Sequence, residues 1–151
     1  MTIERIVSGG QTGVDRAALD AAMQAGIPVG GWCSKGRRAE DGTIPERYPL
    51  SETPSRRYAQ RTAWNVRDSD GTLILHAGTL EGGTALTKTK ARSYGRPTCT
   101  VAVNADDADE QIRAWVESET IRVLNIAGPR ESEVPGIYES ARRVLTTLLS
   151  G

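Results

Sequence analysis

The sequence contains no phenylalanine, and aromatic residues make up only 5% of its 151 residues. The hydrophobic core must therefore consist mainly of valine, isoleucine, leucine and alanine. Cores of this composition are typical of a parallel sheet that is buried on both faces by helices. The shortage of aromatic residues thus favours an α/β fold.

Net charge is also absent, because nineteen basic residues balance nineteen acidic ones. This balance argues against nucleic acid as a partner. The only two cysteines, Cys33 and Cys99, form no CxxC pair, so neither a disulfide framework nor a zinc site is expected. The sequence has no signal peptide and no apolar run long enough to span a bilayer, which predicts a cytoplasmic protein without a membrane partner.

Strand and helix patterns alternate along the chain. Strands are predicted at 3–8, 27–32, 71–77, 98–103 and 121–127, and helices at 13–26, 55–69, 82–95, 107–118 and 135–149. Residues 71–77 are the most apolar strand and should be central, and Ser55 is a candidate N-cap. Residues 33–54 are expected to form a long charged loop. No repeat or internal boundary is visible. The prediction is a single-domain α/β protein over residues 1–151, with a Rossmann-like, doubly wound, mainly parallel sheet of about five strands flanked by helices.

Ligands of such sheets bind at the carboxyl ends of the strands, which makes the first glycine-rich loop a candidate site. Gly9, Gly10 and Gly13 precede a helix for which Thr12 is a suitable N-cap, and free N–H groups at a helix start attract anions. The alternative is a tight turn without a ligand. The spacing matches neither GxGxxG nor a Walker A motif. Asp15 either complements the helix dipole or binds a ligand.

Arg16 opposes the dipole of the same helix, so it needs an anionic partner: a ligand, Asp15, Asp20 or Asp41. Farther along the chain, Lys35, Gly36, Arg37 and Arg38 follow the second strand. These charges are either solvated or form a clamp for a phosphate, since arginine offers bidentate geometry.

Two more loops carry glycines at the same predicted edge of the sheet. Gly82 and Gly83 precede Thr84 at a helix start, and they could face the first loop across the crevice where strand order reverses. Gly128 and Arg130 follow the last strand. His76, the only histidine, ends the most apolar strand and is expected to be a satisfied core or rim residue rather than a catalytic one.

Several of these segments resemble a known group as a set: "SGGQTGVDRAALD", "GGWCSKGRRAEDG", "RYPLSET", "RT…NVRDSDGTLI", "GGTALT" and "LNIAGPRES". The chain resembles the molybdenum cofactor carrier family of the Rossmann-like superfamily that includes the lysine-decarboxylase-like and DprA-type proteins. The resemblance implies a small anionic ligand, the molybdenum cofactor, which is a pterin with a phosphate and a dithiolene. The candidate binding residues are Gly9, Gly10, Gln11, Thr12, Gly13, Asp15, Arg16, Lys35, Gly36, Arg37, Arg38, Gly82, Gly83, Thr84, Gly128 and Arg130.

The sequence predicts a carrier that binds the molybdenum cofactor or another phosphorylated heterocycle or nucleotide. An enzyme acting on a nucleotide, with Asp15, Glu40, Asp41 or His76 as acid or base, is the alternative, although no catalytic residue is assigned. Phosphoribohydrolases of the superfamily have a glutamate soon after their glycine-threonine segment, whereas "GGTALTKTKA" has Lys88 and Lys90. A signalling module is a third possibility, and the superfamily resemblance implies a homo-oligomer.

Overall fold

Five parallel strands form the main sheet of the computed structural model, which describes residues 1–78 and 83–150. The strand order is β2-β1-β9-β7-β8, and every neighbouring pair is parallel. The strands are β1 (Arg5–Val7), β2 (Val29–Gly30), β7 (Gly71–His76), β8 (Thr98–Ala102) and β9 (Val123–Ala127). The predicted parallel sheet is therefore confirmed.

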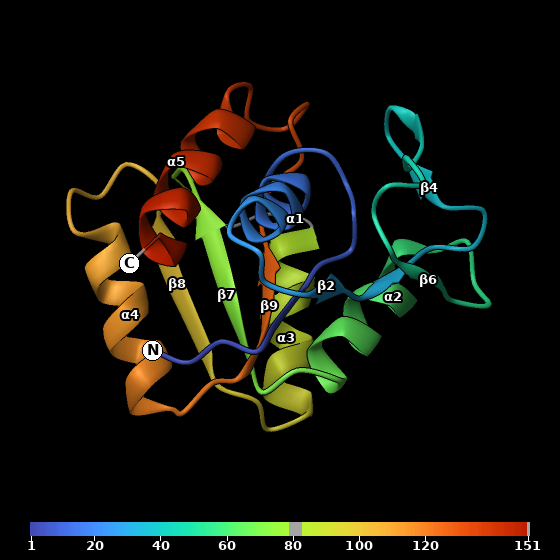
Figure 1. The fold of residues 1–151 in the computed structure, drawn as a ribbon. Coiled ribbons are helices and arrows are strands. Elements are labelled where there is room, and N and C mark those ends of the chain that lie inside the picture. The colour runs from blue at the N-terminus through green and yellow to red at the C-terminus, as the bar shows by residue number, and fades with distance from the viewer. Residues whose placement is uncertain (79–82, 151) are drawn as a thin grey trace.

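Helices cover both faces of this sheet (Figure 1). On one face lie α1 (Val14–Gln24), α4 (Ala108–Ser118) and α5 (Ile137–Leu149), with α5 in contact with both of the others. On the other face, α2 (Tyr58–Arg67) packs against α3 (Gly83–Ser93). The predicted α/β architecture is confirmed. Among the helices of the described ranges, none is both long enough and apolar enough to cross a membrane.

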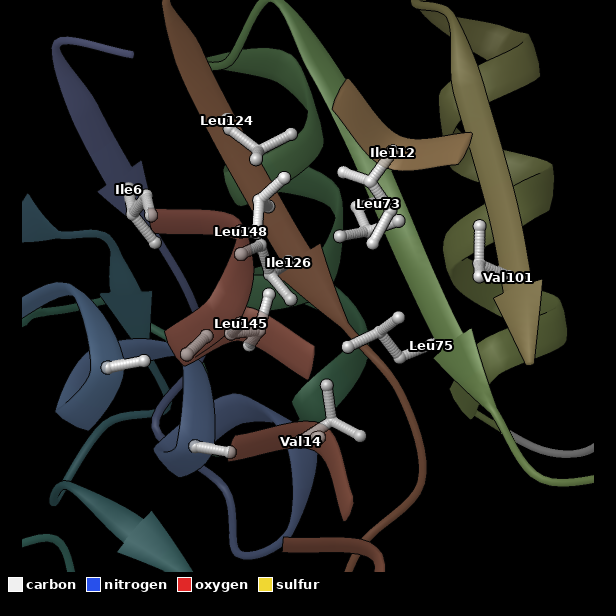
Figure 2. Packing of buried hydrophobic residues seen from close by; sticks show 14 of the residues in the cluster. Ile6, Val14, Leu73, Leu75, Val101, Ile112, Leu124, Ile126, Leu145 and Leu148 are labelled. Carbon is white, nitrogen blue, oxygen red and sulfur yellow. The ribbon is translucent and has the colours of Figure 1, made fainter. Parts of the chain in front are cut away.

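The main core lies between the sheet and the α1, α4 and α5 layer, and it is aliphatic as the composition predicts. Leu73 and Leu75 of β7 and Leu124 and Ile126 of β9 are fully buried. Figure 2 shows these side chains directed toward the helices, where Leu145 of α5 meets them. Full burial of each such side chain contributes about 1.5–3 kcal/mol, so this layer supplies much of the stability of the fold.

The segment after β2 differs from the prediction. The expected single strand over 27–32 divides at Gly31 into β2 and β3 (Trp32–Cys33), and β3 leaves the main sheet to pair with β6 (Ser51–Glu52). The expected loop at 33–54 also contains an antiparallel pair, β4 (Arg38–Ala39) with β5 (Gly42–Thr43). A second apolar cluster holds this segment against α1; it consists of Leu19, Cys33, Ala39, Ile44, Tyr48 and Leu50. The segment is therefore ordered by its own small core.

The start of α2 is also different. The prediction placed it at Ser55 with that side chain as N-cap, but the helix begins at Tyr58 after Arg57, and no side chain caps it. The Ser55 hydroxyl instead accepts a hydrogen bond from the Arg57 N–H at 3.0 Å. Because this bond closes a turn before the helix, α2 starts three residues later than the pattern indicates.

Strand order changes which loops meet at the crevice. The prediction set the loops after β1 and β7 opposite each other, but β9 lies between these two strands. If the strands are counted from β9, the order becomes 3-2-1-4-5, the standard order of dinucleotide-binding sheets. The loop that follows β9 thus occupies the position at which such sheets carry their first phosphate-binding turn.

Candidate functional site

A cavity of about 280 Å³ lies beside the carboxyl end of β9. Small-molecule sites usually measure ~300–1,000 Å³, so a compact ligand matches this volume. Described residues from four separate segments of the chain line this cavity. Its lining consists of Gln11, Asp15, Tyr58, Arg61, Thr62, Leu86, Thr87, Ala127, Gly128, Arg130 and Glu133.

An ion pair between Asp15 of α1 and Arg61 of α2 forms part of this lining. Asp15 is 4% exposed, and its Oδ2 accepts hydrogen bonds from Arg61 Nη1 at 2.9 Å and from the Gln11 N–H at 3.2 Å. Burial raises the pKa of Asp15 above its ordinary value of 3.8, although the charge of Arg61 opposes this shift. The pair therefore joins the two helical layers at the site and keeps a carboxyl group in the cavity.

Gly9 makes room for this ion pair. A Cβ atom at position 9 would lie 1.7 Å from Arg61 Nη1. The guanidinium group thus lies directly against the backbone of the first loop, which a side chain at Gly9 would prevent. This glycine is explained by close packing.

The amide group of Gln11 has a fixed orientation. Its Oε1 accepts hydrogen bonds from the N–H groups of Thr12 at 3.1 Å and Glu40 at 2.9 Å. Since only the carbonyl end of an amide can accept both bonds, Nε2 must lie on the other side. Gln11 is 3% exposed, and its Nε2 has no hydrogen-bond partner among the described residues.

Glu40 connects the β4–β5 turn to the first and last loops through hydrogen bonds. Its carboxylate accepts hydrogen bonds from the Thr12 hydroxyl and from the N–H and hydroxyl of Ser132, while Arg130 Nε lies 3.9 Å away. Desolvation raises the pKa of Glu40, but the hydrogen bonds from Ser132 and Thr12 outweigh it and hold the pKa below its ordinary value. Glu40 thus joins three loops beside the cavity.

Replacing Glu40 with glutamine is expected to lower the free energy of unfolding by about 1 kcal/mol at pH 7, because neutral hydrogen bonds are weaker. The pKa of Glu40 is lower in the folded state than its ordinary value of 4.5. Its stabilisation of the fold is therefore fully present above pH 4.5 and is lost as the pH falls through the folded-state pKa. The difference in unfolding free energy between wild type and Glu40→Gln should therefore become smaller in acid. Urea unfolding at pH 7 and pH 3.5 measures it, with the exposed Glu46→Gln as control. A gap that persists undiminished in acid would contradict this role.

The basic residues near the second strand lie away from the cavity lining. Arg16 forms a two-point ion pair with Asp41, one of the partners expected for it, at 2.5 and 2.8 Å. Arg37 donates to four main-chain carbonyls of its own segment, those of Ile44, Pro45, Tyr48 and Leu50. Its guanidinium therefore maintains the fold of 37–50.

Lys35, Gly36 and Arg38 are likewise outside the cavity lining. Lys35 is exposed, and the Gly36 N–H donates to Glu52 at 2.6 Å. Arg38 donates to the Arg56 carbonyl, and its guanidinium lies 4.7 Å from the centre of the Tyr58 ring. Tyr58, which lines the cavity, thus connects it with Arg38.

The remaining predicted residues belong to three loops. Gly10, Thr12 and Gly13 shape the first loop, where the N–H groups of Gly10 and Thr12 donate to side chains within it. Gly82 lies outside the described residues, and Gly83 and Thr84 begin α3. Four predicted residues line the cavity together: Gln11, Asp15, Gly128 and Arg130.

Sequence reasoning missed the contribution of α2 and α3. Tyr58, Arg61 and Thr62 come from the first two turns of one helix, and Leu86 and Thr87 come from the second turn of another. The rule that ligands bind at loops cannot select such positions. One signal was available, since Arg61 and Thr62 form the "RT" of a segment already used for the family resemblance.

The site was also compared with what metal binding and acid–base chemistry would require of its side chains. Among the residues that the structure describes, no group of three or more His, Cys, Asp or Glu side chains could hold a metal ion. His76 Nδ1 lies 2.8 Å from the Gly78 carbonyl, and His76 does not line the cavity. Of the described residues, Asp15 and Glu133 contribute carboxyl groups to the lining.

Strand order and helical layers define an α/β protein of the Rossmann-like class. The chain belongs to the circularly permutated YpsA SLOG family, whose model matches residues 6–149. Permutation agrees with the strand order counted from β9. A crystal structure named "putative molybdenum carrier protein", from Syntrophus aciditrophicus SB, is similar over 99% of this chain and 96% of its own, with 47% identity and a TM-score of 0.95. No curated protein matches the chain.

Proposed function

We propose that the cavity binds a small phosphorylated heterocycle and that the protein carries this ligand, with the molybdenum cofactor as the foremost candidate. The observation that carries the proposal is the meeting of Arg61 and Arg130 in one cavity beside β9. Guanidinium groups bind phosphate well, and although Arg61 pairs with Asp15 and Arg130 with Glu133, Arg130 is 41% exposed and can turn to an anion. The cavity also lies where open α/β sheets bind their ligands.

The residues present fit a phosphorylated pterin. Arg130, at the edge of the cavity, offers a guanidinium for a phosphate, and the unpartnered Nε2 of Gln11 offers a donor for a polar ring. The cofactor brings sulfur ligands for its own metal, so the protein needs no metal cluster of its own. The similarity to a protein named as a molybdenum carrier supports this choice of ligand.

An enzyme acting on a nucleotide is the second candidate, and Asp15 is the observation that favours it. A buried carboxyl group with a raised pKa that lines a cavity is a common feature of acid–base catalysis. The ion pair with Arg61 gives the same carboxyl a structural role. Nucleotide turnover that disappears in Asp15→Asn would favour the enzyme over the carrier.

Binding by the purified protein tests the proposal. Arg130→Gln is expected to weaken binding of the cofactor, or of GMP as a substitute, by about tenfold or more, because a charge-assisted contact to phosphate is lost. Calorimetry or fluorescence measures the affinity, and mass spectrometry identifies what co-purifies. Arg122→Gln is the matched control, since Arg122 pairs with Glu4 and lies outside the cavity. Equal affinities in the two variants would exclude the cavity as the site.

The predicted homo-oligomer remains a separate expectation. Sedimentation of the purified chain, with and without ligand, measures it directly.

A further inference from the structure

We infer that Gln11 and Asp15 form a recognition floor for the ring of the ligand: they select a heterocycle that presents a carbonyl acceptor beside a ring N–H donor on one edge. This inference rests on the proposed function and adds to it the part of the ligand that is distinguished. Oxo-purines and pterins share such an edge, with a carbonyl next to a ring N–H.

Gln11 supplies the donor. Two backbone N–H groups hold its Oε1, so the NH₂ group cannot exchange places with it by rotation of the amide. An unsatisfied buried donor costs about 1–3 kcal/mol. A ring carbonyl that accepts from Nε2 would remove this cost.

Asp15 supplies the acceptor. Both hydrogen bonds that the described residues make to its carboxylate end on Oδ2, one from Arg61 and one from the Gln11 N–H. Oδ1 receives none from the described residues. The second bond joins Asp15 to the main chain of Gln11, and both residues line the same cavity.

The exposed fractions of the lining residues indicate how the ligand is oriented in the cavity. Gln11 and Asp15 are 3% and 4% exposed, whereas the Arg130 side chain is 41% exposed. The two groups that match a ring edge therefore lie at the bottom of the cavity, and the cation that matches a phosphate lies at its rim. The ring enters first, and the phosphate remains near solvent at Arg130.

Two nucleotides that differ only at this edge test the inference on the wild-type protein. IMP offers the carbonyl and the ring N–H, whereas purine riboside 5′-monophosphate has an acceptor nitrogen and no donor. IMP is expected to bind at least about tenfold more tightly, because the purine analogue leaves Asp15 Oδ1 unpaired. The affinity for AMP shows the effect of an amino group in place of the ring carbonyl, and the affinity for a pterin monophosphate compares a pterin with a purine. The affinity for ribose 5-phosphate measures the phosphate contribution alone.

Asp15→Asn is the diagnostic variant. Arg61 and the Gln11 N–H are donors, so they keep the amide oxygen at the Oδ2 position and turn the NH₂ group toward the cavity. The acceptor becomes a donor, and the preference for IMP should fall to less than about threefold, while affinity for ribose 5-phosphate is retained. Gln11→Glu changes the donor to an acceptor, and this variant should bind IMP about tenfold more weakly.

The outcomes separate the two proposals. Equal binding of IMP, the purine analogue and ribose 5-phosphate would overturn the recognition floor and leave the proposed phosphate site standing. No binding of any phosphorylated ring, the pterin included, would overturn both. The preference within the wild-type series does not depend on whether either variant folds.

Discussion

Replacement of Gly13 with alanine is expected to lower the free energy of unfolding by about 3–5 kcal/mol. Gly13 has φ +81° and ψ −129°, a conformation that L-residues rarely adopt. A Cβ atom there would also lie 2.3 Å from the Pro129 carbonyl oxygen and 2.8 Å from the Glu131 nitrogen. Both contacts are main-chain atoms, so the first and last loops would have to separate.

Gly26→Ala is the control for this result. Gly26 also has a positive φ, +75°, but nothing lies within 4 Å of a Cβ built on it. Its substitution should therefore cost only the conformational penalty of about 1–2 kcal/mol. Urea unfolding of both variants measures the difference, and a similar loss in the two would show that the approach of the last loop contributes little.

Arg61→Leu is expected to destabilise the protein by about 3–5 kcal/mol at pH 8, because Asp15 would remain buried without its partner. The pKa of Asp15 is already raised by burial, and loss of Arg61 removes the charge that opposes this shift. A carboxyl group with a raised folded-state pKa loses stability as pH rises above its unfolded value, here 3.8. The deficit should thus be small at pH 4 and grow toward pH 8.

Two further variants test this explanation. Adding Asp15→Asn to Arg61→Leu should restore most of the loss at pH 8, because no charge remains to be buried. Arg67→Leu removes an ion pair with Asp68 whose side chains are 41% and 45% exposed, and it should cost at most about 1 kcal/mol. Urea unfolding over the pH series provides the data. A deficit for Arg61→Leu that does not vary with pH would mean that lost packing, rather than the charge of Asp15, is responsible.

Strong periodic patterns were enough to predict the layers of the fold. The apolar run 71–77 predicted a central strand, and β7, which lies next to the middle strand β9, is buried along Gly71–Leu75. The segment 33–54 could not be predicted in the same way, because its order depends on Arg37 binding four carbonyls at a distance in sequence. No local pattern encodes such contacts.

The candidate site was predicted in part, for a related reason. Glycines at loop positions identify places where the backbone must approach something closely, but not what approaches. At Gly9 the neighbour is the protein's own Arg61, and at Gly13 it is the last loop. Arg130 and Gly128 were selected because they follow a strand, and they do line the cavity. Arg61 could not be selected, since the contact between α2 and the first loop is a tertiary one.

The position of β9 between β1 and β7 has a consequence for synthesis of the protein on the ribosome. The central strand of the sheet is the last to be made, so a growing chain that lacks residues 123–149 has β1 and β7 without the strand that joins them. The proposed pocket also lacks its Gly128 and Arg130 wall until then. Pairing of the first strand with the last requires a long chain closure, which favours slow, late folding. The proposed pocket therefore cannot form on a nascent chain before β9 and the loop after it have been made.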